Sequence, residues 1–72
     1  MSVDVSVEIR VNGEPRRVAS GISLAEMVEG LGLDPRRVAV ERNLEIVPRS
    51  SLGHMRVEDG DNYEIVHFVG GG

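Results

Sequence analysis

Two local patterns that together predict a β-hairpin occur in residues 3–19, VDVSVEIRVNGEPRRVA. Residues 3–11 alternate apolar and polar side chains, which is the period of a strand with one buried face. Asn12-Gly13 follows and favours a two-residue hairpin turn, in which both turn residues must reach positive φ. A second strand is therefore expected to run back through EPRRVA. Pro15 places that strand at a sheet edge, where a missing N–H is tolerated.

The next segment, GISLAEMVEGLGL, changes to the period of a helix. Ser23 and Glu26 have the spacing of a capping box, in which each side chain accepts a hydrogen bond from the backbone of the other residue. We expect one short amphipathic helix that ends at Gly30 or Gly32. Its apolar stripe follows the spacing i, i+3, i+4, i+7: Leu24, Met27, Val28 and Leu31.

The remainder of the chain predicts further strands. Asp34-Pro35 breaks the chain, after which strands are expected at residues 37–40 and 45–47, and Asp59-Gly60 indicates a tight turn. The last apolar segment, YEIVHFV at residues 63–69, is apolar on both faces, which is typical of a central strand.

These elements predict an α+β fold of the β-grasp (ubiquitin-like) type, a mixed four- or five-stranded sheet packed on one helix. The first and last strands would lie side by side in the centre and run parallel. A plain antiparallel sheet with a helix on one face is the alternative. Residues 1–69 are expected to form this single domain, and residues 70–72 a flexible glycine tail.

Composition excludes several classes of function. The 72 residues include no cysteine and two histidines, so we expect neither a disulfide nor a metal site. The net charge of −4, without clustered cations, disfavours nucleic acid as a partner. No apolar run reaches the length of a membrane span, and the N-terminal residues resemble no targeting peptide. A soluble, cytoplasmic protein is expected.

The last residues, HFVGGG, suggest three uses. Glycines without a Cβ would let the terminal carboxylate pass through a narrow channel to be activated by ATP. A frayed end without function fits the same residues. A phosphate-binding loop is excluded because no lysine and no following helix are present.

Longer segments decide between the first two uses. From Val11 onward, VNGEPRRVASGISLAEMVEGLGLDPRRVAVERN, EIVPRS and DGDNYEIVHFVGGG resemble the sulfur carrier proteins of thiamine biosynthesis, the ThiS family. The likeness covers nearly the whole chain. It departs at Leu44, where the family commonly has a glycine, so a different turn is expected there. It departs also at Phe68, which is bulkier than the residue expected before VGGG.

The resemblance implies a mechanism. An adenylating enzyme would activate the Gly72 carboxylate with Mg-ATP, and a persulfide donor would replace AMP. The resulting thiocarboxylate would pass its sulfur to thiazole synthase. Gly70 and Gly71 would thread the tail. The chain would be a carrier and co-substrate rather than an enzyme, with no stably bound cofactor, and a monomer when free.

Partner binding and pathway stay open on the sequence alone. An apolar patch for docking the adenylating enzyme is expected on the sheet face opposite the helix, although ordinary packing explains the same residues: Val66, Phe68, Ile46 and Val47. The same tail would also serve a sulfur carrier for molybdopterin, cysteine or tRNA thiolation, or a ubiquitin-like protein modifier.

Overall fold

A computed structural model describes residues 5–68 of the chain. The expected strand residues Val3, Asp4 and Val69, and the expected tail at residues 70–72, lie outside the described residues. No helix within the described part is long and apolar enough to cross a membrane. The elements follow the order β1 (Ser6–Val11), β2 (Glu14–Ala19), α1 (Leu24–Gly30), β3 (Val38–Arg42), β4 (Glu45–Val47) and β5 (Asn62–His67).

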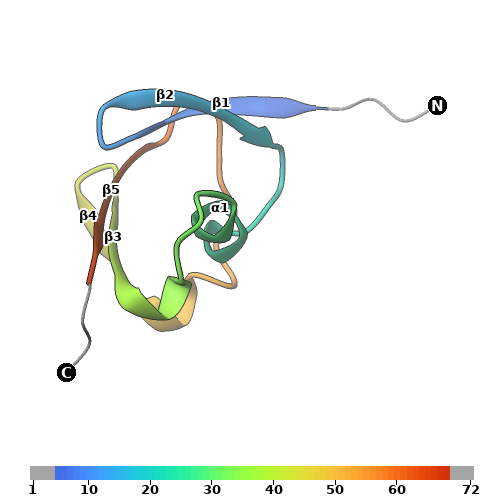
Figure 1. Ribbon diagram of the computed structural model, residues 1–72. Helices are drawn as coiled ribbons and strands as arrows, with labels where there is room; N and C mark the ends of the chain where they lie inside the picture. Colours follow the sequence, from blue (N-terminus) through green and yellow to red (C-terminus); the bar gives the residue numbers. More distant parts are fainter. Residues whose placement is uncertain (1–4, 69–72) are drawn as a thin grey trace.

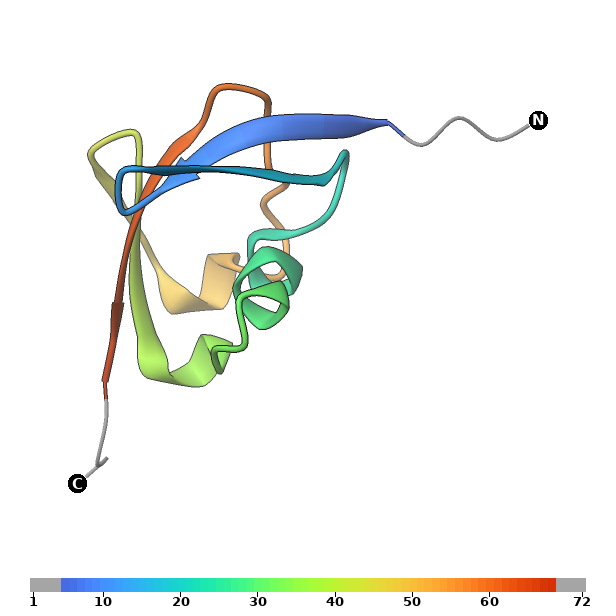
Figure 2. The same ribbon diagram turned by 45° about the horizontal axis from the view of Figure 1, so that its top comes forward.

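The five strands form one mixed sheet that curves around α1 (Figures 1 and 2). The strand order is β2-β1-β5-β3-β4, with β1 parallel to β5 and every other neighbouring pair antiparallel. The parallel pair confirms the β-grasp prediction and rules out the plain antiparallel sheet. The central place of β5 and the edge place of β2, which contains Pro15, are confirmed as well.

Two hairpins use the same kind of turn. Asn12 and Gly13 have φ values of 52° and 86°, and they join Val11 to its cross-strand partner Glu14, as predicted. Asn43 and Leu44 repeat this conformation between β3 and β4, with φ values of 51° and 72°. Leu44 therefore adopts positive φ although its side chain makes this conformation unfavourable, and the different turn expected at Leu44 is not found: it has the form of the Asn12-Gly13 turn.

The predicted capping box begins α1. The Ser23 Oγ accepts a hydrogen bond from the Glu26 N–H at 3.0 Å, and Glu26 Oε1 accepts one from the Ser23 N–H at 2.9 Å. The helix ends at Gly30, and Gly32 follows with a φ of 84°. The N–H of Leu33 donates to the carbonyl of Val28 at 3.3 Å, so a backbone carbonyl of the last turn is satisfied after the helix has ended.

The strand predicted at residues 37–40 has different bounds. Residues 35–37 form a 3₁₀ turn, and β3 begins at Val38 and continues to Arg42. Pro35 has the backbone angle of a first helical residue, and the Asp34 side chain accepts from the Arg36 N–H at 2.9 Å. These two local features favour a helical turn over a strand at Arg37.

The core lies between the concave face of the sheet and α1. Leu24, Val28 and Tyr63 are completely buried there. The segment between β4 and β5, in which the sequence shows little regular pattern, also contributes to the core. The buried apolar residues are Ile9, Val11, Leu24, Met27, Val28, Val38, Val40, Val47, Leu52, Val57, Tyr63 and Ile65.

Candidate functional site

An exposed apolar cluster lies on the sheet face that points away from α1, over β3, β4 and β5. Side chains alternate along a strand, so the neighbours of buried Val40, Val47 and Ile65 point to this open face. Ala39 pairs directly with Val66 across β3 and β5. The open-face patch is defined by four residues that are all exposed: Ala39, Ile46, Val66 and Phe68.

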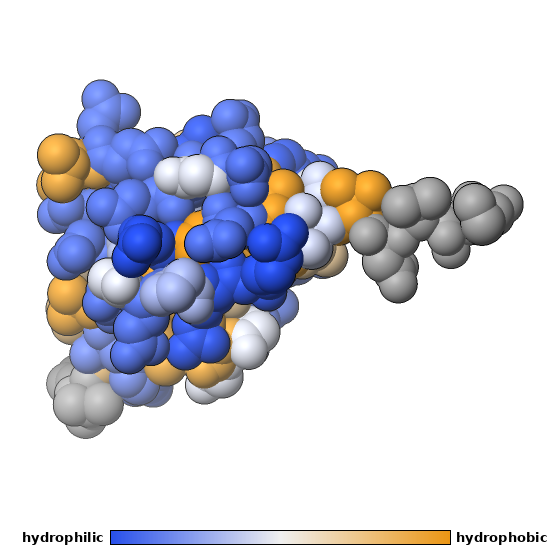
Figure 3. Space-filling model, turned by 90° about the horizontal axis from the view of Figure 1, so that it is seen from above, coloured by the Kyte–Doolittle hydropathy of each residue, from blue (hydrophilic) through white to orange (hydrophobic). Residues whose placement is uncertain are grey.

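Seen from above, the molecule is largely hydrophilic, and separate apolar areas lie on its left edge, the side on which β3, β4 and β5 lie in Figure 1 (Figure 3). Ile46 is 80% exposed and Val66 58% exposed, although both belong to strands. Exposed apolar residues that gather in this way are typical of an interaction surface.

The sequence placed Val47 in the same patch, and this assignment is wrong. Val47 is only 7% exposed and belongs to the core cluster. It pairs with Val40 in β3, which is also buried, whereas Ile46 pairs with Glu41. Consecutive residues of a strand point to opposite faces, so only Ile46 belongs to the open face. Ala39 takes the remaining place in the patch, and the sequence analysis did not single it out.

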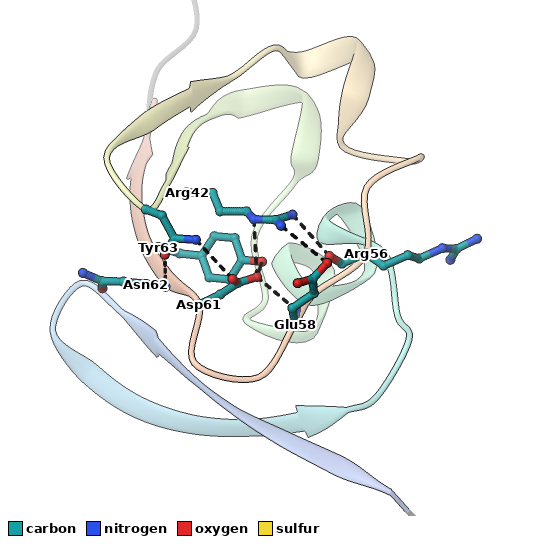
Figure 4. Close-up of polar contacts among 7 residues, drawn as sticks. Arg42, Arg56, Glu58, Asp61, Asn62 and Tyr63 are labelled. Carbon is teal, nitrogen blue, oxygen red and sulfur yellow. Dashed lines mark hydrogen bonds and ion pairs between the residues drawn. The ribbon is translucent and has the colours of Figure 1, made fainter.

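A buried carboxylate holds the start of β5. Asp61 is 5% exposed and accepts the Tyr63 hydroxyl at 2.7 Å, the Glu58 N–H at 3.0 Å and the Asn43 amide at 3.2 Å. Arg42 Nε lies 3.5 Å from Asp61 Oδ2 (Figure 4). This network joins β5 to the β3–β4 hairpin and to the turn before β5. Sequence reasoning missed it, because an aspartate after Asp59-Gly60 has the signature of a loop.

Two asparagines from the hairpin turns also bind the backbone of β5. Asn12 Oδ1 accepts from the Ile65 N–H at 2.8 Å, and Asn12 Nδ2 donates to the Ile65 carbonyl at 3.1 Å. Asn43 Oδ1 accepts from the Asn62 N–H at 2.9 Å. β5 is therefore held by side chains from both neighbouring hairpins.

The groups with shifted pKa values lie away from the open-face patch. Burial, followed by the hydrogen bond to Asp61, raises the pKa of Tyr63 far above its usual range. The hydrogen bond from the Ser23 backbone lowers the pKa of Glu26, and the side chain of Arg36 lowers that of Asp34. These shifts arise from a helix cap, a 3₁₀ turn and a buried network, all of which stabilise the fold.

The last described residue, Phe68, belongs to the open-face patch. Its N–H donates to the carbonyl of Arg37 at 2.8 Å, which continues the pairing of β5 with β3. The predicted functional residues Gly70, Gly71 and Gly72 follow and lie outside the described residues. Within residues 5–68, no three histidine, cysteine, aspartate or glutamate residues gather in an arrangement that could hold a metal ion.

Comparison with known proteins identifies the family. The sequence model of the ThiS family matches residues 9–72, which include the second half of β1, all later strands, α1 and the last three glycines. The chain belongs to the ThiS family. The match extends from the middle of β1 to the last residue, so the family resemblance inferred from VNGEP, EIVPRS and VGGG is confirmed.

A solved structure shares the fold of this ThiS-family chain. The crystal structure of the thiamine biosynthesis protein ThiS from Geobacter metallireducens superposes with a TM-score of 0.76 at 33% sequence identity. The superposition covers 92% of this chain and 100% of that one. This chain therefore shares its β-grasp architecture with that ThiS protein.

Relatives of two lengths also match. A thiazole synthase from Paramagnetospirillum magneticum is 48% identical over 66 residues, which are 92% of this chain and 20% of that protein. This chain thus spans about a fifth of the length of that relative. The sulfur carrier protein ThiS of Bacillus subtilis is 38% identical over 50 residues, which are 69% of this chain and 76% of that protein.

Proposed function

We propose that this chain is a sulfur carrier of thiamine biosynthesis, a co-substrate rather than an enzyme, whose reactive group is the carboxylate of Gly72. The observation that carries this proposal is the ThiS-family match, which continues through the three terminal glycines. Further support comes from the similarity to the sulfur carrier of Bacillus subtilis. In the fold, β5 is the last strand before those glycines, and hydrogen bonds from the Asn12 and Asn43 side chains hold it to both neighbouring hairpins.

Activation of the carboxylate requires an adenylating enzyme with ATP and Mg²⁺. A carboxylate oxygen attacks the α-phosphate of ATP, an acyl-adenylate forms, and pyrophosphate leaves. A persulfide then attacks the acyl carbon, so that a C–S bond forms while the C–O bond to AMP breaks. A thiol reduces the acyl disulfide and releases the thiocarboxylate, with a disulfide as the second product. The sequence contains no cysteine, so partner molecules supply both sulfur groups.

The thiocarboxylate would then be consumed by a thiazole synthase. The relative from Paramagnetospirillum magneticum, in which the matching region forms 20% of a protein named thiazole synthase, supports this partner. The reducing step needs free thiols, which the cytosol maintains, so we infer a cytoplasmic location.

The open-face patch is the surface we assign to docking of the adenylating enzyme. Its apolar side chains are exposed, and one of them, Phe68, lies four residues before Gly72, so an enzyme that acts on Gly72 binds close to the patch. Burial of such side chains provides binding free energy at a protein interface.

The proposal is tested with ATP–pyrophosphate exchange by the adenylating enzyme of the same organism. Deletion of Gly72, or the substitution Gly71→Val, should abolish exchange and leave the melting temperature unchanged. A Cβ is expected to obstruct a channel shaped for bare backbone. The matched control is Gly30→Ala in α1, where a new Cβ meets no atom within 4 Å and φ is not positive. Unchanged exchange in the tail variants would contradict the proposed role of Gly72.

Intact-mass measurement on protein from native cells tests the product. The expected species ends at Gly72 and is heavier than the carboxylate by the exchange of one oxygen for sulfur. Because the thiazole synthase consumes this species, deletion of the synthase gene should make the thiocarboxylate accumulate. A modified species that is insensitive to the synthase would indicate a carrier for another pathway.

A further inference from the structure

Two glutamates lie directly opposite each other on the open face. Glu41 of β3 pairs with Glu64 of β5 on one side and with Ile46 of β4 on the other. The neighbouring row of the same face holds Ala39 beside Val66. The two carboxylates therefore lie beside the open-face patch, next to Ile46 on β4 and to the row of Ala39 and Val66.

No cation of the described residues neutralises this pair. The ion pairs within residues 5–68 involve other acids, namely Glu8, Asp34, Glu58 and Asp61. Arg42, the basic residue that follows Glu41, points to the opposite face and lies near Asp61. Like charges directly opposite in neighbouring strands destabilise a sheet. Packing within this domain alone therefore does not favour the pairing of Glu41 with Glu64.

The length of chain after Phe68 limits how far from this pair the enzyme can act. Residues 69–72 add four residues after Phe68, and a fully extended chain spans at most about 3.5 Å per residue. An enzyme that acts on the Gly72 carboxylate therefore has its active site within about 14 Å of Phe68. Since Phe68 belongs to the open-face patch, the surface around that active site is brought next to the patch and its two glutamates.

We propose that the adenylating enzyme places an arginine between Glu41 and Glu64 when it covers the open-face patch. A guanidinium is planar and has five N–H donors, so one group can donate to both carboxylates. This inference rests on the proposed function and names the chemistry of the partner surface. The apolar residues supply buried area, and the two carboxylates select the partner by charge.

Selectivity follows from the cost of burying unpaired charge. An apolar surface without a cation would bury two carboxylates without partners, which is strongly unfavourable. A matching arginine removes that cost and the repulsion within the pair. The glutamates thus discriminate against apolar surfaces that would otherwise fit the patch.

The test measures exchange kinetics for the double variant Glu41→Gln with Glu64→Gln. Glutamine keeps the shape of glutamate and removes its charge. The KM for this chain should rise about tenfold or more, with kcat unchanged, because the contact acts in binding. Added salt should raise the KM of the original chain more than that of the double variant. The free variant should unfold at an equal or higher urea concentration, since the like-charge contact is gone.

The matched control is Glu29→Gln, which removes one exposed carboxylate from α1 on the other side of the sheet. Its KM should equal that of the original chain. A double variant with the KM of this control would overturn the arginine contact and leave the proposed function intact. A less stable double variant would also overturn it, because the glutamates would then stabilise the isolated fold. No exchange with the original chain would overturn the proposed function itself.

Discussion

The Asn12 side chain forms the pair of hydrogen bonds to Ile65 that the backbone of a neighbouring strand would form, although the two residues are 53 positions apart in sequence. The side-chain amide accepts the Ile65 N–H and donates to the Ile65 carbonyl, at 2.8 Å and 3.1 Å. The Asn12 N–H also donates to the Tyr63 carbonyl at 2.9 Å. β1 ends at Val11, so this side chain extends the contact with β5 beyond the last backbone pair.

Substitution of Asn12 by glycine should therefore destabilise the domain without disturbing the turn. Glycine adopts positive φ at no steric cost, so the turn itself is retained. The Ile65 N–H and carbonyl lose their partners, and the expected loss is about 2 kcal/mol in the free energy of unfolding. Urea denaturation measures it. A midpoint equal to that of the original chain would mean that water replaces the amide at no cost.

Substitution of Leu44 by glycine should stabilise the domain by about 1 kcal/mol. Leu44 has a φ of 72° and is 84% exposed, so its side chain adds strain and little packing. The greater freedom of glycine in the unfolded chain offsets part of the gain. Leu44→Val is the comparison, because a β-branched side chain should lower stability at positive φ. Thermal unfolding of the original chain, Leu44→Gly and Leu44→Val measures the order of their stabilities.

Neighbouring residues of β4 should respond in opposite ways to the same charge. Val47→Asp buries a carboxylate in the core and should cost more than about 3 kcal/mol, enough to unfold much of the protein. Ile46→Asp changes an exposed side chain, so stability should change by less than about 0.5 kcal/mol. Its KM in the exchange reaction should rise, since the open-face patch loses apolar area. Circular dichroism and exchange kinetics on the same preparations test both faces of the strand.

Phe68→Asp tests the end of the patch closest to the tail. Phe68 is 48% exposed, so the variant should keep the melting temperature to within a few degrees. Binding to the adenylating enzyme should weaken, because the contact would desolvate a charge. An unfolded variant would assign Phe68 to the core instead.

The capping box should make stability depend on pH in acid. The hydrogen bonds from Ser23 lower the pKa of Glu26 below its ordinary value of 4.5. A depressed folded pKa means that the stabilisation is present above pH 4.5 and is lost as pH falls through the lower, folded value. Glu26→Gln should remove this contribution. The difference in unfolding free energy between the original chain and Glu26→Gln should shrink as the pH falls below 4.5 through the lower folded pKa of Glu26. A difference that stays constant with pH would contradict this coupling of protonation to folding.

Local signals predicted most of the elements correctly because they act over a few residues. Asn12-Gly13 and the Ser23–Glu26 capping box each specify their own hydrogen bonds, and both occur as expected. Where two local signals compete, the sequence is less decisive: Arg37 belongs to the turn started by Pro35 rather than to β3. The candidate site was harder to predict, because exposure depends on strand register.

Alternation, turn residues and motifs along the chain predicted the element types and the likeness to the ThiS family, whereas the choice between a β-grasp and a plain antiparallel sheet came from the parallel pairing of β1 with β5. The three-dimensional fold sets which side of each strand faces solvent. It placed Val47 in the core and Ile46 on the open face, and it brought Glu41 against Glu64 from strands that are 23 positions apart. It also buried Asp61 among donors from three segments. A one-residue change in pairing would exchange the two faces, and this pairing is set by long-range contacts that no local pattern contains.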